Sequence, residues 1–162
     1  MIAGSGQRGG SIVSESVVEV RLGSEQVNYL AIVVRGRAYR RSRDYWDGNW
    51  LHATVTVQAG KFSGEVPGLV RAEELATFHD RLDAVDKTLE GDARFETMER
   101  WLSFQVEMGK TGGVTVSGTI RDAVGDPGNQ LSFRFEHDQT FLASTVQQLK
   151  EAVKAYPVYG KP

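Results

Sequence analysis

The densest unusual cluster of side chains that could do chemistry in this 162-residue chain lies between Asp44 and His52, in the segment DYWDGNWLH. It holds two of the three tryptophans, together with carboxylates, an asparagine and a histidine. Aspartate, glycine and asparagine are typical of turns, whereas Trp and Tyr often anchor protein interfaces. Two interpretations follow. The segment is a turn pinned by aromatic rings, with Trp46 and Trp50 in the core, or it is a binding loop whose Tyr45 and Trp46 contact a ligand or partner.

Nucleophilic, metal-based and phosphate-binding chemistry find no support in the other residue patterns. The chain has no cysteine, which removes thiolate nucleophiles, thiolate metal ligands and disulfides. The histidines at positions 52, 79 and 137 form no H-x-x-x-H or H-x-x-E-H pair that could bind a metal. The glycine-rich residues 4–9 neither follow a predicted strand nor open a predicted helix, as a phosphate-binding loop requires. We therefore predict a protein that is not an enzyme and has no metal or cofactor.

Arginines precede the aromatic cluster, since residues 35–45 are RGRAYRRSRDY. Such interleaving could grip phosphates while aromatic rings stack on bases. The whole chain has a formal charge of −2, unlike a dedicated nucleic-acid binder, which makes nucleic acid an unfavoured partner. The residues leave an alternative function open, a small-ligand or nucleic-acid binding module that uses residues Arg35–His52.

Acidic side chains dominate the rest of the chain. Residues 1–43 carry a balance of +4, which leaves −6 for residues 44–162. Residues 71–99 alone have nine acidic and four basic side chains. Such a surface is either solvated without further role or attracts a basic partner.

Apolar alternation predicts strands in the first part of the chain. It covers residues 18–22, 29–37 and 51–57, followed by a short strand around Phe62 that ends at Val66-Pro67-Gly68. In the second of these strands Arg35 and Arg37 fall on the face opposite to Leu30, Ile32 and Val34.

Two amphipathic helices are predicted, one before and one after a second group of strands. The first has Glu73 and Glu74 in its first turn, Gly91 at its end, and a buried stripe of Leu75, Phe78, Leu82, Val85 and Leu89. The second helix follows Asp138, ends at Tyr156-Pro157, and has a stripe of Leu142, Val146, Leu149 and Val153. Strands between the helices are marked by Phe95 and by alternation over residues 102–108, 114–120 and 131–135.

Short turns join these strands, which favours antiparallel pairing. We therefore predict an α+β fold, a mostly antiparallel, curved sheet of about seven or eight strands with two amphipathic helices on one face. Residues 1–11 are expected to be a flexible segment, residues 12–156 a single domain and residues 157–162 a C-terminal tail. The sequence has no apolar run of membrane-spanning length and no secretory signal pattern, so we expect a cytoplasmic location without a membrane partner.

The aromatic cluster also resembles a known family. Tyr45-Trp46-Asp47-Gly48-Asn49-Trp50-Leu51 is similar to the Asp…Asn-Trp-Leu segment of small bacterial proteins grouped as WapI-type immunity proteins. The resemblance covers most of residues 15–155 and includes the stretches Glu74-Leu75, Phe78–Leu82, Phe95–Phe104 and Phe135–Leu142. It implies a protein that neutralises a toxin of a contact-dependent or polymorphic toxin system by binding it, and it implies no catalytic residues.

The resemblance implies a protein partner, and a basic toxin domain would fit the acidic character of the chain. The outer side of the first predicted helix has the highest density of carboxylates, and these are expected to be exposed. The loop before it could supply aromatic anchors. The predicted partner-binding residues are Glu73, Asp80, Asp83, Asp86 and Glu90 on the helix, and Tyr45 and Trp46 in the loop.

Overall fold

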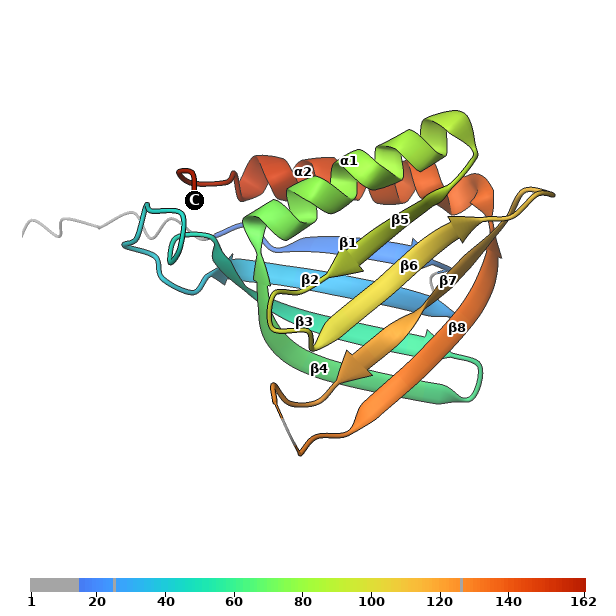
Figure 1. Cartoon of the computed structure of the whole chain (residues 1–162), viewed down its shortest axis with the longest axis horizontal. Helices are drawn as coiled ribbons and strands as arrows, with labels where there is room; N and C mark the ends of the chain where they lie inside the picture. Colours follow the sequence, from blue (N-terminus) through green and yellow to red (C-terminus); the bar gives the residue numbers. More distant parts are fainter. Residues whose placement is uncertain (1–14, 25, 126) are drawn as a thin grey trace, which may run out of the picture.

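The computed structural model describes residues 15–24, 26–125 and 127–162, and the glycine-rich segment that we predicted to be flexible lies outside these ranges. The described residues form eight strands, two α-helices and one 3-10 turn (Figure 1). In chain order these are β1 (Val18–Gly23), β2 (Tyr29–Arg37), β3 (Trp50–Ala59), β4 (Phe62–Arg71), α1 (Ala72–Thr88), β5 (Asp92–Glu96), β6 (Leu102–Met108), β7 (Gly113–Arg121), β8 (Gln130–Asp138), the 3-10 turn η1 (Gln139–Phe141) and α2 (Leu142–Ala155).

The strands form two four-stranded antiparallel sheets, ordered β1-β2-β3-β4 and β5-β6-β7-β8. The predicted α+β class and antiparallel pairing are therefore confirmed, although the strands divide into two sheets. Helix α1 follows β4 directly and carries the chain away from that sheet, so β5 pairs with β6 and begins a second sheet. The helices pack against each other, α2 also against β1 and α1 also against β5 (Figure 1).

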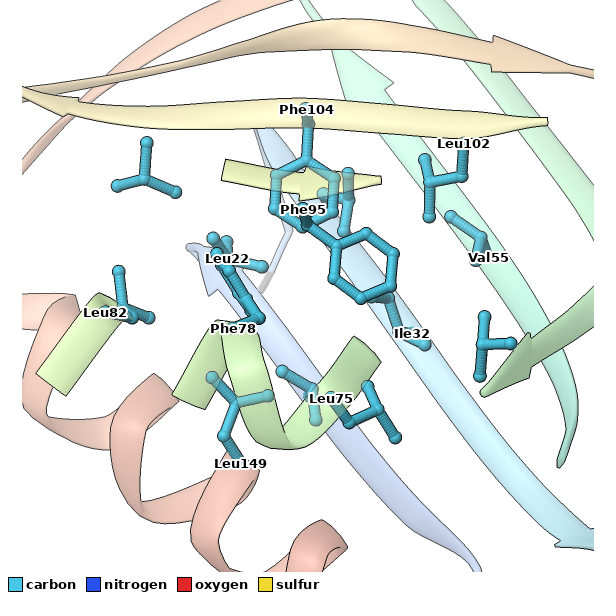
Figure 2. Close-up of a cluster of buried hydrophobic side chains, with 14 of the residues drawn as sticks. Leu22, Ile32, Val55, Leu75, Phe78, Leu82, Phe95, Leu102, Phe104 and Leu149 are labelled. Carbon is cyan, nitrogen blue, oxygen red and sulfur yellow. The ribbon is translucent and has the colours of Figure 1, made fainter. Parts of the chain in front are cut away.

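One hydrophobic core is shared by both sheets and both helices. At its centre the ring of Phe78 from α1 meets Phe95 and Phe104 from the second sheet, at centroid distances of 5.6 and 5.2 Å. Figure 2 shows these rings beside Leu22 and Ile32 of the first sheet. Edge-to-face contacts of this kind add to the free energy gained by burying apolar area.

The predicted stripe of α1 is buried except for its last member. Leu89 is 45% exposed because the helix ends at Thr88 and Leu89 adopts a left-handed conformation, with φ of 54°. This conformation turns the chain toward β5, so the side chain leaves the helical stripe. In α2 the buried residues are Leu142, Thr145, Leu149 and Ala152, whereas the predicted Val146 and Val153 are half-buried.

Strand β4 is longer than predicted, because Val66-Pro67-Gly68 lies inside it. A proline is tolerated here because β4 is an edge strand and need not donate to a further neighbour. Gly68 is required by packing, since a Cβ at this position would lie 2.4 Å from the ring of Trp101. The indole nitrogen of Trp101 donates to the carbonyl of Leu69 at 2.9 Å, which holds the second sheet against this strand.

Candidate partner-binding surface

The loop of residues 44–50 is shaped by its own side chains. The Oδ1 atom of Asp44 accepts hydrogen bonds from the backbone N–H groups of Trp46 and Asp47, both at 2.9 Å. The bond from Asp47 is the main cause that lowers the pKa of the Asp44 carboxyl below its usual value. A Cβ at Gly48 would lie only 2.6 Å from the carbonyl oxygen of Asp44. The predicted turn chemistry is therefore present in the structure.

Arg71 fastens this loop to the start of α1. Its side chain is 1% exposed, and its guanidinium donates to the carbonyls of Trp46 and Tyr45, both at 2.7 Å. It also lies over the rings of Tyr45 and Trp50, at 5.2 and 4.8 Å from their centroids. Because Arg71 is the residue before Ala72, the loop and the first turn of the helix are held together.

Arg37 is buried, although the alternation places it on the face of β2 opposite to the core residues Leu30, Ile32 and Val34. A bulge between Val34 and Gly36 shifts the strand register, and the side chain is only 7% exposed. The guanidinium donates to the carbonyls of Gly48 and Pro157, both at 2.6 Å. It therefore ties the loop to the segment that follows α2.

The two tryptophans of the cluster have different environments. Trp50 is half-buried beneath Arg71, and Leu51 after it is fully buried. Trp46 is 59% exposed, so the interpretation that places it in the core is wrong. Its indole contacts the ring of Tyr45 edge-on at 5.2 Å. The loop is thus a pinned turn that also presents one large aromatic side chain to solvent.

Glu73 is less exposed than predicted, because it pairs with the buried guanidinium of Arg71. Its side chain is 23% exposed, and its Oε1 atom accepts from Nε of Arg71. The other carboxylate oxygen is buried without a hydrogen-bond partner in the described structure. The sequence did not predict this pairing, because the predicted strand ended before Arg71 and an arginine by itself carries no signal of burial.

Glu74 was outside the predicted site, yet it closes the first turn of α1 against the second sheet. Its carboxylate accepts from the backbone N–H groups of Arg71 at 2.9 Å and Met98 at 2.7 Å. Burial raises the pKa of this carboxyl to about 7, although both backbone bonds oppose the rise. A glutamate three residues after a helix N-cap is the available sequence signal, but the N-cap here is arginine rather than the usual Ser, Thr, Asp or Asn.

A cleft of about 390 Å³ lies between α1 and β5, beside these glutamates. Across it, the guanidinium of Arg81 donates to the carbonyl of Arg94 at 3.0 Å. At the end near Glu74, the side chain of Met98 is 54% exposed. The residues that line the cleft are Glu73, Glu74, Thr77, Arg81, Arg94, Phe95 and Glu96.

The other predicted acidic residues extend along α1, away from the loop. Asp80 is exposed, with 84% of its side chain accessible, and its carboxylate lies 3.0 Å from Nδ1 of His79. The carboxyl of Asp83 accepts from Lys87 at 2.6 Å, and this bond lowers its pKa. At 1.5 Å per residue, Asp86 lies about 20 Å along the axis from Glu73.

Asp86 is half-buried, and Glu90 is exposed beyond the helix end. The structure therefore brings together Glu73, Tyr45 and Trp46 through Arg71, and it leaves Asp80, Asp83, Asp86 and Glu90 as a separate acidic strip.

The chain matches the sequence model of the Immunity protein WapI-like family over residues 21–157. It belongs to this family. The match includes the loop of residues 44–50, both helices and all of the second sheet of this WapI-like protein. Membership supports a role as an immunity protein with a protein partner, and it suggests a non-enzymatic role.

Among curated proteins, none matches the WapI-like chain. A solved structure described as "Crystal structures of trypanosoma bruciei MRP1/MRP2" is similar to it, with 14% sequence identity and a TM-score of 0.45, over 85% of this chain and 83% of that chain.

The described residues of the WapI-like protein contain no group of three or more His, Cys, Asp or Glu side chains that could hold a metal ion. Within the same ranges, no helix is long and apolar enough to cross a membrane. The cytoplasmic location stays a prediction.

Proposed function

We propose that this WapI-like immunity protein neutralises a toxin by binding it and covering its active site, without changing any covalent bond. The main observation in support is that Trp46 is exposed on a loop beside the acidic start of α1. The buried side chains of Arg71 and Arg37 hold this loop in place. A rigid aromatic anchor loses little conformational entropy when a partner covers it. Tryptophan is also among the side chains that contribute most to binding energy at interfaces.

The proposed surface has an apolar part and an acidic part. Trp46 and Met98 supply the apolar part, on either side of the Arg71–Glu74 contacts. The acidic strip of Asp80, Asp83, Asp86 and Glu90 adds negative charge along α1. Toxins that act on nucleic acid must approach phosphates and are therefore often basic, so such a strip would raise the association rate and favour the correct partner.

The anchor is tested with the cognate toxin domain, to be sought in the same operon, by measuring its dissociation constant for wild type and Trp46→Ala. We expect the variant to bind at least about tenfold more weakly, the effect of losing an aromatic hot spot. Phe62→Ala is the matched control, because Phe62 is 70% exposed at the β3–β4 turn, away from the proposed surface. Equal losses in both variants, or no loss in either, would remove Trp46 from the interface.

The acidic strip is tested by the association rate of an Asp80/Asp83/Asp86→Lys variant at low and high salt. We expect slower association than wild type at low salt and a smaller difference at high salt, because salt screens exposed charges. The control is Glu19/Glu107/Glu136→Lys, which makes the same change of charge on exposed strand residues. Equal association rates of the helix variant and wild type at low salt would place the interface elsewhere.

The alternative binding module at Arg35–His52 has less support, because several of its arginines are already engaged. The guanidinium of Arg37 is bound to backbone carbonyls, and that of Arg43 donates to the hydroxyl of Tyr159 at 2.6 Å. Arg40 lies 3.7 Å from the carboxylate of Glu15. Nucleic acid retained on purification, detected as excess absorbance at 260 nm, would favour this alternative.

A further inference from the structure

The segment after α2 packs against the loop of residues 44–50, which carries Trp46. We predicted residues 157–162 as a tail, and in the structure they lie beside this loop, near the C-terminal end of α2 (Figure 1). The side-chain amide of Asn49 donates to the carbonyl of Tyr159 at 2.9 Å, and the N–H of Tyr159 donates back to Oδ1 of Asn49 at 2.8 Å. This reciprocal pair resembles one step of a sheet ladder, with a side chain in place of a strand.

Asn49 connects this pair to the rest of the proposed surface. Its side-chain amide also donates to the carbonyl of Tyr45 at 2.9 Å, and its backbone carbonyl accepts from Ala72, the first residue of α1, at 2.9 Å. Asn49 is fully buried, so these bonds are shielded from water. A displacement of Tyr159 would therefore leave a buried amide with unmet hydrogen bonds at the centre of the loop.

The ring of Tyr159 is held by two guanidinium groups. That of Arg37 lies 3.7 Å from the ring centroid and that of Arg43 lies 5.1 Å from it, within the range of cation–π attraction. The ring also touches the loop itself, since a Cβ at Gly48 would lie 3.0 Å from it. Arg37 joins the two segments directly, because one guanidinium donates to both Gly48 and Pro157.

We infer that Tyr159 is a positioning residue for partner recognition, which locks the loop of residues 44–50 in the conformation that presents Trp46. This inference rests on the proposed function for its partner, but the coupling between Tyr159 and the loop has its own readout. Arg71 holds the loop from the α1 side, and Tyr159 holds it from the other side. Without Tyr159 the loop samples other conformations, and the affinity for a partner falls by the fraction of time spent in the binding conformation.

The coupling is tested in the full chain, without a partner, by NMR of the indole N–H groups. Tyr159→Ala should shift or broaden the Trp46 signal and speed amide exchange over residues 44–50 by about tenfold or more. Trp101 is the internal reference for folding, since its indole is buried and donates to the carbonyl of Leu69 in β4 rather than to the loop. Val158→Ala, a change at the exposed neighbour, should leave all three indole signals unchanged.

A second variant, Tyr159→Phe, distinguishes the contribution of the tyrosine ring from that of its hydroxyl group. Tyr159→Phe keeps the stacked ring and the backbone pair with Asn49 and loses only the bond from Arg43, so it should restore most of the loop order. With the cognate toxin domain, Tyr159→Ala should raise the dissociation constant about tenfold, while Tyr159→Phe and Val158→Ala stay within about twofold of wild type.

Loop signals unchanged in Tyr159→Ala would overturn the inference, as would a disordered loop with unaltered toxin affinity. If the loop responds as expected but wild type binds no toxin domain, the proposed function fails while the coupling of Tyr159 to the loop stands.

Discussion

Stability should fall as pH rises toward neutrality, because Glu74 is protonated more readily in the folded chain than in the unfolded one. Its pKa is raised from 4.5 to about 7 by burial. Between these values the folded state binds more protons than the unfolded state, so the free energy of unfolding decreases with pH. The stabilisation is complete below about pH 4.5 and is lost as pH passes about 7. At about 1.4 kcal/mol per pH unit, the loss is about 3 kcal/mol.

The effect is isolated by comparing wild type with Glu74→Gln. Glutamine keeps one acceptor for the two backbone N–H groups of Arg71 and Met98 but cannot ionise. We expect the variant to be less stable than wild type at acid pH, by about 1 kcal/mol for the lost hydrogen bond. Above about pH 7 the order should reverse, because wild type then carries a desolvated charge that the variant lacks.

The measurement is urea unfolding of both proteins at about pH 4.5, 6 and 8, with the difference in unfolding free energy taken at each pH. Other titrating groups contribute to both proteins and largely cancel in this difference. Asp83→Asn provides a contrast of opposite sign, since Lys87 lowers the pKa of Asp83 and its contribution is lost as pH falls. Parallel pH profiles for wild type and Glu74→Gln would refute the assignment of a raised pKa to Glu74.

Three further substitutions test the packing that supports the surface. Leu82→Ala should lower the unfolding free energy by about 2–5 kcal/mol, because the side chain is fully buried; an unchanged urea midpoint would contradict the placement of this helix face. Gly68→Ala should cost about 1–3 kcal/mol and alter the fluorescence of Trp101, because the added methyl group overlaps its ring; wild-type stability would mean that the ring lies elsewhere. Arg71→Met should cost about 3–5 kcal/mol by leaving Glu73 and two carbonyls unpaired, and a variant as stable as wild type in urea would show that the guanidinium is dispensable.

The parts of the fold that follow from local periodicity could be predicted from the sequence. The stripe from Leu75 to Val85 has the helical period, and the four residues of that stripe are buried. The strands of both sheets follow from alternation, since a residue's face depends only on its neighbours in the strand. The division into two sheets could not be predicted in this way, because pairing partners depend on where α1 carries the chain.

The site was less predictable, because its contacts join residues far apart in the chain. Arg37 and Pro157 are separated by 120 positions, and Asn49 and Tyr159 by 110. The bulge that turns Arg37 inward interrupts the alternation on which its predicted face depended. Composition favours solvent for an isolated arginine or glutamate, and only the packed structure shows that Arg71 and Glu73 pair with each other.

The residues of the aromatic cluster, Asp44–His52, thus have two kinds of role: some are buried and shape the loop, and others are exposed. In the Asn-Trp-Leu motif, Asn49 and Leu51 are fully buried and Trp50 is covered by Arg71, so the motif builds the loop. Trp46, three residues earlier, is the large side chain that this construction leaves exposed. A structural motif can therefore be shared by proteins with different partners, since the loop shape depends on buried groups and recognition depends on exposed ones. It follows that changes of partner should involve exposed positions such as Trp46, while Asn49 remains tied to the fold.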